Sequence, residues 1–312
     1  MSVVPNVVGK DSMEAQNGTS GIPSTNSAES VGGAGDSAPL VHISDSVDSV
    51  LALRFEEWLS DLECASVRVV NNSDSEAVHD LRVALRRIRS LLKVVRGVYD
   101  RQSVESVRGE LKRVAEVTDA LRDEEALVET MFELELDANC RSAVSRWISG
   151  RSGTKRSLRD GVVNLLVGGV LDGPRDRIRA LLVRSSTLCR VVDAQCFALC
   201  AVMKAESRVD ALRSADVADV SGMHSLRIAY KQLRYVVEAL WSILSPERRM
   251  IAGVASAFQK VLGNMHDCDV AIGVVREASG LNKKTRQAVL EALEARRSRY
   301  ARQYCRAVLV GV

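Results

Sequence analysis

Hydrophobic residues recur every three to four positions along most of the chain after residue 44, which is the spacing of one face of an α-helix. The first run indicates a helix at about 45–70, and the second, at about 75–98, has a clear apolar stripe. Similar runs predict helices at about 103–118, 120–136, 193–214, 221–244, 246–265, 267–279 and 282–308. No strand-like alternation stands out, so the chain is expected to be all-α.

The middle of the chain interrupts this pattern. Residues 149–154 (Ser-Gly-Arg-Ser-Gly-Thr) indicate a loop, and Asp172-Gly173-Pro174 indicates a turn that precedes another helix. Farther on, Ser245-Pro246 has the residue types of a helix N-cap followed by the first helical position. The other residues between 138 and 188 have no clear periodicity, so we assign no helix bounds there.

Residues 1–44 differ from the rest of the chain. They are rich in Ser, Gly, Asn and Thr, contain no aromatic residue, and hold one basic residue against four acidic ones. Such a segment cannot bury enough apolar surface to offset the entropy lost on ordering, so we expect a disordered tail. The tail carries a formal charge of −3 in a chain of +3, which leaves +6 on residues 45–312.

The overall composition suits a helical protein with a sizeable core, because 46% of the residues are hydrophobic and only 4% are aromatic. No signal peptide is visible, and the most apolar stretch, residues 161–171, is too short to span a membrane. The seven cysteines are scattered. Cys189, Cys196 and Cys200 would share one helix face, where we interpret them as small buried residues rather than metal ligands. Together these features predict a soluble cytoplasmic protein.

An internal repeat carries the main functional signal. His79-Asp-Leu-Arg-Val-Ala-Leu-Arg-Arg-Ile-Arg89 matches His224-Ser-Leu-Arg-Ile-Ala-Tyr-Lys-Gln-Leu-Arg234 at an offset of 145 residues. A second pair of segments, 118–125 and 262–269, follows at an offset of 144. Two motifs at a nearly constant offset indicate a tandem duplication, with halves at about 45–140 and 190–310.

The repeated motif places one His and several basic residues on a single helix face, three or four positions apart. The first copy contains His79, Arg82, Arg86, Arg89 and Lys93, and the second contains His224, Arg227, Lys231 and Arg234. No acidic residue stands between Leu81 and Tyr99. Because like charges at this spacing destabilise a helix, a stripe of one sign indicates an anionic ligand.

Less specific interpretations of the stripes remain open. A basic stripe is often only a solvated helix face, and each His could be a packed core residue. Catalysis has little support, because Gly9-Lys-Asp-Ser12 lacks the spacing of a phosphate-binding loop and neither GxSxG nor HExxH occurs. Residues 266–269 (His-Asp-Cys-Asp) would point in different directions on a helix, which disfavours a metal site. We therefore expect no catalytic residue, metal or cofactor.

These residues resemble the CHAD family, the conserved-histidine α-helical domain. The resemblance rests on the two His-x-Leu-Arg motifs, on Leu111-Lys112-x-Val-Ala followed by Arg122-Asp123, and on Gln259-x-x-Leu262-Gly263 followed by Asp267. It covers about residues 45–310. It implies two four-helix bundles related by a pseudo-two-fold axis, with a basic channel between them, and it implies binding of inorganic polyphosphate and association with polyphosphate granules.

The resemblance also implies a set of polyphosphate-binding residues: His79, Arg82, Arg86, Arg89, Lys93, Lys112, Arg122, His224, Arg227, Lys231 and Arg234. The two halves differ at three positions of interest. Asp119 stands where the second half has Gly263, Gln232 stands where the first half has Arg87, and Glu238 follows the second stripe where Lys93 ends the first. We expect the second half to bind more weakly.

Nucleic acid is the main alternative ligand, since a basic helix can follow any phosphate backbone. The stripes offer few aromatic residues for base stacking apart from Tyr230 and Tyr235, which makes nucleic acid the weaker candidate. A third alternative is a scaffold on which an acidic protein docks.

Overall fold

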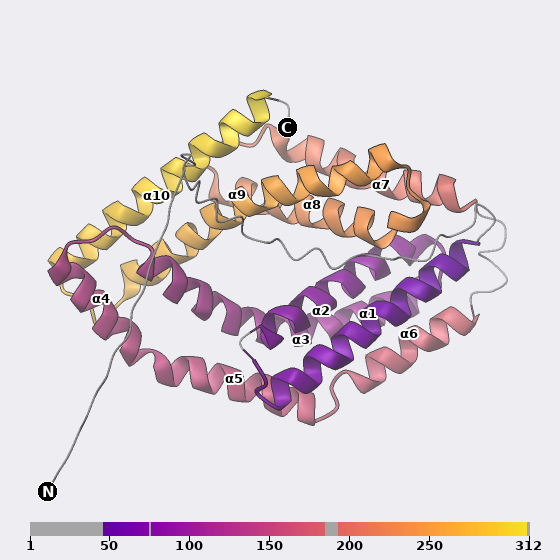
Figure 1. Ribbon diagram of the computed structural model, residues 1–312, viewed down its shortest axis with the longest axis horizontal. Helices are drawn as coiled ribbons and strands as arrows, with labels where there is room; N and C mark the ends of the chain where they lie inside the picture. Colours follow the sequence, from indigo (N-terminus) through magenta and orange to yellow (C-terminus); the bar gives the residue numbers. More distant parts are fainter. Residues whose placement is uncertain (1–45, 75, 185–192, 311–312) are drawn as a thin grey trace, which may run out of the picture. The chain divides into compact units, whose positions relative to one another are not determined.

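The structure is a computed structural model that describes residues 46–74, 76–184 and 193–310 (Figure 1). The expectation of a disordered tail at 1–44 lies outside the described residues. Within them the chain is all-helical, as predicted, and no strand is present. The elements in order are α1 (Val47–Val70), α2 (Ala77–Val94), the short 3₁₀ helix η1 (Val95–Gly97), α3 (Arg101–Phe132), α4 (Ala138–Gly150), α5 (Ser152–Val167), α6 (Asp172–Arg184), α7 (Ala194–Arg213), α8 (Val220–Ala239), the 3₁₀ helix η4 (Trp241–Ile243), α9 (Pro246–Glu277) and α10 (Lys283–Val310).

The helix starts follow ordinary capping chemistry. The Asp100 carboxylate accepts a 2.7 Å hydrogen bond from the amide of Ser103 at the start of α3. Ser245 caps α9 and Pro246 takes its first position, as the sequence predicted. Because these caps satisfy amides that have no partner inside the helix, they set where the long helices begin.

Helices α3 and α9 correct the sequence-based bounds. Each is one continuous helix of 32 residues, whereas we expected breaks near residues 119 and 266. In α3 the Thr118 hydroxyl is buried and donates to the Ala115 carbonyl oxygen at 2.9 Å, so this polar residue needs no loop. In α9 the buried residues Leu262, Met265 and Cys268 continue the helical spacing through the expected break.

Two smaller predictions were also wrong. The loop expected at 149–154 is a sharp turn at Arg151 between α4 and α5. The Arg151 guanidinium is held by Glu124 of α3 at 2.5 and 2.7 Å, which fixes this turn against the core. Cys196 and Cys200 are exposed on α7 rather than buried, because Ala198, Val202 and Ala205 form the packed face of that helix. Cys189 lies outside the described residues.

The packing places the two repeated motifs side by side. Helix α2 packs on α1 and α3, α8 packs on α7 and α9, and the two groups meet where α2 contacts α8 and α3 contacts α9. Helices α5 and α6, which follow the expected first half, cover α1 and α3. A large core joins α1, α2, α3, α7, α8 and part of α9, while a second core joins the later parts of α3 and α9 to α4 and α10.

Candidate anion-binding site

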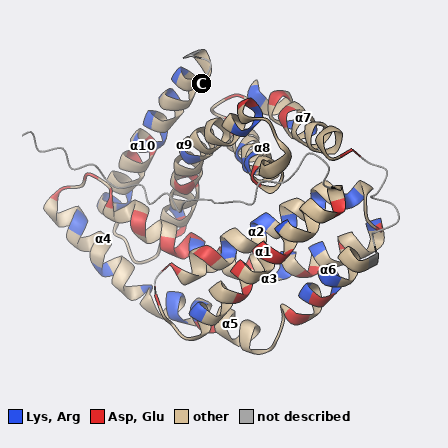
Figure 2. Cartoon of the chain, turned by 45° about the vertical axis from the view of Figure 1, so that its right-hand side comes forward, with Lys and Arg blue, Asp and Glu red and all other residues tan. Residues whose placement is uncertain are grey.

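Lys and Arg positions recur along both α2 and α8, the helices that carry the motif (Figure 2). Arg82 of α2 is buried. Its guanidinium donates a 2.7 Å hydrogen bond to the Thr118 carbonyl oxygen and forms a 2.9 Å ion pair with Asp119. Burial lowers the pKa of Arg82 to about 10, and the nearby Arg86 acts in the same direction. Arg82 therefore joins α2 to α3 instead of lying on an open helix face.

Asp119 also neutralises the next residue of the first stripe. Arg86 is half-buried and approaches the same carboxylate oxygen of Asp119 at 3.3 Å. One carboxylate thus serves two guanidinium groups in the first half.

The equivalent position in the second half carries no counter-charge. Arg227 of α8 corresponds to Arg82, and Gly263 of α9 corresponds to Asp119. A Cβ atom added to Gly263 would lie 3.9 Å from the Arg227 Nε, so the glycine faces this guanidinium directly. The Nε of Arg227 is buried and has no hydrogen-bond partner among the described residues. Burial lowers the pKa of Arg227, and the Asp267 carboxylate opposes that shift.

Lys231 lies among cations from both halves. Burial, together with the positive charges of Arg227, Arg86 and Arg82, lowers the pKa of its ammonium group to about 6. Arg86 and Arg82 belong to α2, whereas Lys231 belongs to α8. The contact between the two motif helices therefore gathers positive groups of both repeats into one region, which we call the central cluster: Arg82, Arg86, Arg227 and Lys231.

Two histidines meet beside the central cluster. The Nδ1 atoms of His224 and His266 lie 3.2 Å apart, and the ring centroids are separated by 4.5 Å. Burial lowers the pKa of His266 to about 3, with Arg227 and His224 adding to the effect, and burial also lowers the pKa of His224. Both rings are consequently neutral near pH 7, so one Nδ1 donates and the other accepts.

Acidic groups accompany the central cluster. Asp267 is largely buried, and burial raises the pKa of its carboxyl group, while Arg227 and Arg122 lower it. Asp123 and Asp119 also act on the charges of Arg82 and Arg227. Three carboxylates near four cations leave the centre only modestly positive.

The other predicted residues differ in their surroundings, and of these Arg122 also acts on the charges of Arg82 and Asp267. His79 is exposed. Arg122 is half-exposed and 3.6 Å from Glu129, and Lys112 is exposed and 3.2 Å from Glu116. Both are therefore partly neutralised along α3 itself.

Farther along the stripes, Arg234 and Arg87 share one acidic partner. Arg234 lies 3.4 Å from Glu238 and over the ring of Tyr235, and Arg87 of α2 approaches the same Glu238 at 3.7 Å. Arg89 has a buried Nε with no hydrogen-bond partner among the described residues, and burial lowers its pKa. Lys93 is exposed near the end of α2.

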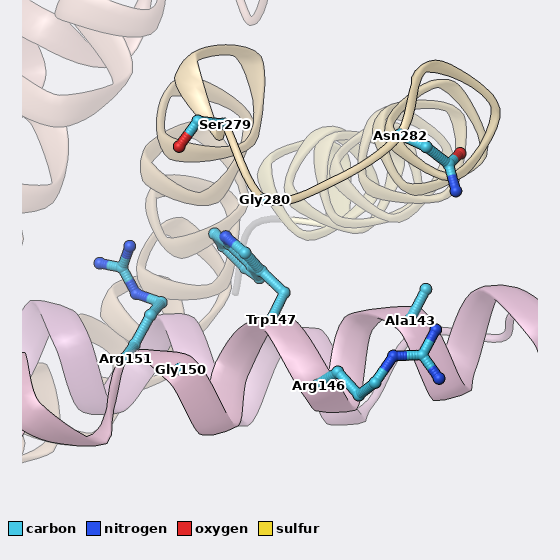
Figure 3. Close-up of a pocket in the computed structure, with 8 residues that line it drawn as sticks. All are labelled: Ala143, Arg146, Trp147, Gly150, Arg151, Ser279, Gly280 and Asn282. Carbon is cyan, nitrogen blue, oxygen red and sulfur yellow. The ribbon is translucent and has the colours of Figure 1, made fainter.

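A pocket of about 520 Å³ lies elsewhere, between α4 and the turn that joins α9 to α10 (Figure 3). Trp147 points from α4 towards Gly280 of that turn, and Arg146 and Arg151 also line the pocket. None of the predicted binding residues belongs to it.

Sequence reasoning missed several contributors to this site. The pairing of His224 with His266 was not foreseen, because the repeat aligns His266 with Arg122 rather than with a His. Lys204 and Arg208 of α7, whose charges lower the pKa of Lys93, also fall outside the repeated motif. Their spacing of four positions on one exposed helix face was the available signal.

Within the described residues no group of three or more His, Cys, Asp and Glu could hold a metal ion. Residues 266–269 do point in different directions: His266 meets His224, while Asp269 forms a 2.5 Å ion pair with Arg297. No described helix is long and apolar enough to cross a bilayer.

The sequence comparison and a solved structure with a similar fold point to the same family. The sequence model described as the CHAD domain matches residues 53–276. Among solved structures, the CHAD domain from the plant Ricinus communis is 19% identical, with 85% of this chain and 89% of that chain covered and a TM-score of 0.67. PptA from Streptomyces chartreusis is 15% identical, with 85% of this chain and 100% of that chain covered and a TM-score of 0.66. No curated protein matches.

Proposed function

The chain belongs to the CHAD domain family, and we propose that it binds inorganic polyphosphate without chemically altering it. CHAD domains are linked in general to polyphosphate binding. The proposal extends this link to the present chain through the arrangement of its own charged residues.

The observation that carries the proposal is the gathering of like charges where α2 meets α8. Lys231 is surrounded by Arg227, Arg86 and Arg82, and this environment opposes its protonation. The carboxylates of Asp119, Asp123 and Asp267 offset part of this charge, and a bound anion would compensate for the remainder. A chain of phosphates supplies one negative charge after another, so it suits a row of cations along adjacent helices better than a single small anion does.

The groups at the centre suit binding rather than reaction. The two guanidinium groups of Arg86 and Arg227 can donate to phosphate oxygens in bidentate fashion, and Lys231 can add a point charge once protonated. The neutral His224–His266 pair can offer one further N–H donor. No step in this role requires a nucleophile or a metal, so the proposed role is non-enzymatic and needs no cofactor.

The burial of two aromatic residues makes nucleic acid the weaker candidate ligand. Tyr230 and Tyr235 were the aromatic residues of the stripe that could have stacked on bases, and both are buried. Tyr230 stacks on Phe258 with ring centroids 4.8 Å apart, inside the core. Neither ring offers a free face to a base. Docking of an acidic protein has no comparable observation in its favour.

A competition experiment tests the proposal. Labelled long-chain polyphosphate is bound to the full chain and displaced with unlabelled polyphosphate, single-stranded RNA or duplex DNA, each matched in phosphate concentration. Polyphosphate should displace the label at the lowest concentration, and the logarithm of its affinity should fall linearly with the logarithm of salt concentration. RNA or DNA that competed more strongly would overturn the assignment of the ligand.

A variant of the central cluster supplies a second test of the proposal. Arg86→Ala with Lys231→Ala should weaken polyphosphate binding and flatten the salt dependence by about two units. Circular dichroism and thermal melting establish that the variant is folded. Unchanged affinity and salt dependence in a folded variant would remove the central cluster from the site. Association with polyphosphate granules inside cells follows from the same proposal, and fluorescence microscopy of a tagged chain checks it.

A further inference from the structure

The outward face of α7 carries three sulfur-containing side chains. Cys196 and Cys200 are exposed, and the Met203 side chain is 55% exposed. These residues stand at positions i, i+4 and i+7 of one continuous helix, which places all three on the same face. The sequence favoured burial in the core as the explanation for the two cysteines, and their exposure removes that explanation.

Core packing does not account for this face. Helix α7 packs on α8, and its buried residues are Ala198, Val202, Ala205 and Val209. A solvated helix normally presents polar residues on the opposite side, but here Leu199, which is 40% exposed, stands among the sulfur-containing residues. The outward face becomes polar only after Met203, where the Ser207 hydroxyl donates a 2.9 Å hydrogen bond to the Met203 carbonyl oxygen. The exposed sulfur atoms are thus confined to the first half of the helix.

The helical spacing brings these sulfur atoms within reach of one another. Residues four positions apart on a helix have Cβ atoms about 5–6 Å apart. A side-chain hydrogen bond with Cys200 raises the pKa of the Cys196 thiol, which agrees with this spacing. Because helical side chains tilt towards the N-terminus, the long Met203 side chain is directed back towards Cys200, one turn earlier.

We propose that Cys196, Cys200 and Met203 form a binding site for a soft monovalent metal ion, and that Cu(I) is the ion that suits it best. Thiolate and thioether sulfur are ligands that Cu(I) prefers. Structural zinc sites take four ligands, whereas this face supplies three. The site is compatible with the lack of any group of three or more His, Cys, Asp and Glu that could hold a metal among the described residues, because its third ligand is a thioether.

Metal binding at this site exchanges two protons for one ion. Each thiol loses its proton to solvent before its sulfur binds the metal, so affinity should increase with pH. One Cu(I) ion with two thiolates and a neutral thioether leaves a complex with a net charge of −1. Lys204 is exposed one helical turn beyond Cys200, where its positive charge can offset that of the complex.

The test compares three variants of the full chain, reduced and kept free of oxygen. Two of them change the site: Cys196→Ser with Cys200→Ser, and Met203→Leu. The matched control is Cys64→Ser with Cys305→Ser, which removes two exposed thiols that lie on different helices, α1 and α10. Cu(I) is titrated against a coloured Cu(I) chelator, native mass spectrometry counts the bound ions, and X-ray absorption identifies the atoms around the metal. Circular dichroism establishes that each variant is folded.

The unmodified chain and the control should each hold one Cu(I) ion per chain against the chelator, with sulfur atoms around it. The double-serine variant on α7 should lose about a hundredfold or more in affinity and Met203→Leu about tenfold, because thiolates are the stronger ligands. Unchanged affinity in the folded double-serine variant would overturn the proposal. So would an equal loss in the control, which would show that scattered thiols bind the metal, or one ion shared between two chains. These outcomes do not depend on whether the chain binds polyphosphate.

Discussion

The guanidinium group of Arg82 donates a 2.7 Å hydrogen bond to the main-chain carbonyl oxygen of Thr118, 36 residues farther along the chain. The acceptor belongs to the middle of α3, and the donor is almost fully enclosed. A residue that the sequence presents as part of an anion-binding stripe is thus also a structural link between two helices. Its replacement is expected to affect stability, and variants intended to probe binding must avoid it.

Replacing Arg82 with Ala should lower the free energy of unfolding by about 1.5–3 kcal/mol, the range for a hydrogen bond that involves a charged group. Asp119 would lose its nearer partner at the same time. Urea denaturation followed by circular dichroism measures the change. Arg86→Ala is the matched control, because Arg86 is more exposed and only 3.3 Å from Asp119, and its loss should cost clearly less. Equal stability of the two variants would contradict a structural role for Arg82.

The two halves can be made alike at the position of Gly263. Gly263→Asp places a carboxylate beside Arg227, where an added Cβ meets only an ordinary contact of 3.9 Å. We expect polyphosphate affinity to fall about tenfold, equivalent to about 1.4 kcal/mol, because Arg227 would become neutralised as Arg82 is. The Asn side chain of Gly263→Asn has nearly the same shape without the charge, so the polyphosphate affinity of this variant should fall much less. A loss of affinity in Gly263→Asp would also show that Asp119 opposes binding by the first half, against the expectation from the sequence that the second half binds more weakly.

Stability should rise with pH because of Lys231. Its pKa is about 6 in the folded protein and 10.5 in an unperturbed side chain. Between these values the unfolded chain binds one more proton than the folded one, so the free energy of unfolding increases with pH over that window. Lys231→Met should flatten this increase and should stabilise the protein near pH 7. Lys260→Met, at an exposed position, should leave the dependence unchanged. Chemical denaturation at a series of pH values from about 6 to 10 measures how the free energy of unfolding of each variant depends on pH.

Deleting residues 1–44 should leave thermal stability and polyphosphate affinity nearly unchanged. The reason is compositional, since a Ser- and Gly-rich segment without aromatic residues contributes little to a core. Its net charge of −3 predicts, if anything, a small gain in affinity at low salt. A large loss of melting temperature or of binding would show that the tail contributes to the fold or the site.

The periodicity of apolar residues was sufficient to predict the helical class and the positions of α1, α2 and α8. It could not predict that α3 and α9 continue through their second motifs. Thr118 and Asp119 resemble the start of a new helix in sequence, but a tertiary partner, Arg82, satisfies them in the middle of an existing one. Such a partner is 36 residues away and leaves no local signal.

The site was predicted in part, for a similar reason. A one-dimensional stripe identifies cations that share a helix face, and the repeat identifies which helices matter. The stripe does not distinguish Arg82, which is buried, from Lys93, which is exposed. Nor can it identify the contact between His224 and His266, because that contact depends on how α8 packs on α9.

The continuous course of α3 and α9 has a consequence for the thermodynamics of binding. A helix of 32 residues extends for about 48 Å, and each of these two is anchored in the large core and again in the second core formed with α4 and α10. Asp123 and His266 lie between those two cores, and Asp119 and Gly263 lie within the part of each helix that the large core anchors. The site is therefore preorganised, and a ligand does not have to order a loop before it can bind. The conformational entropy lost on association is then mainly that of the ligand itself.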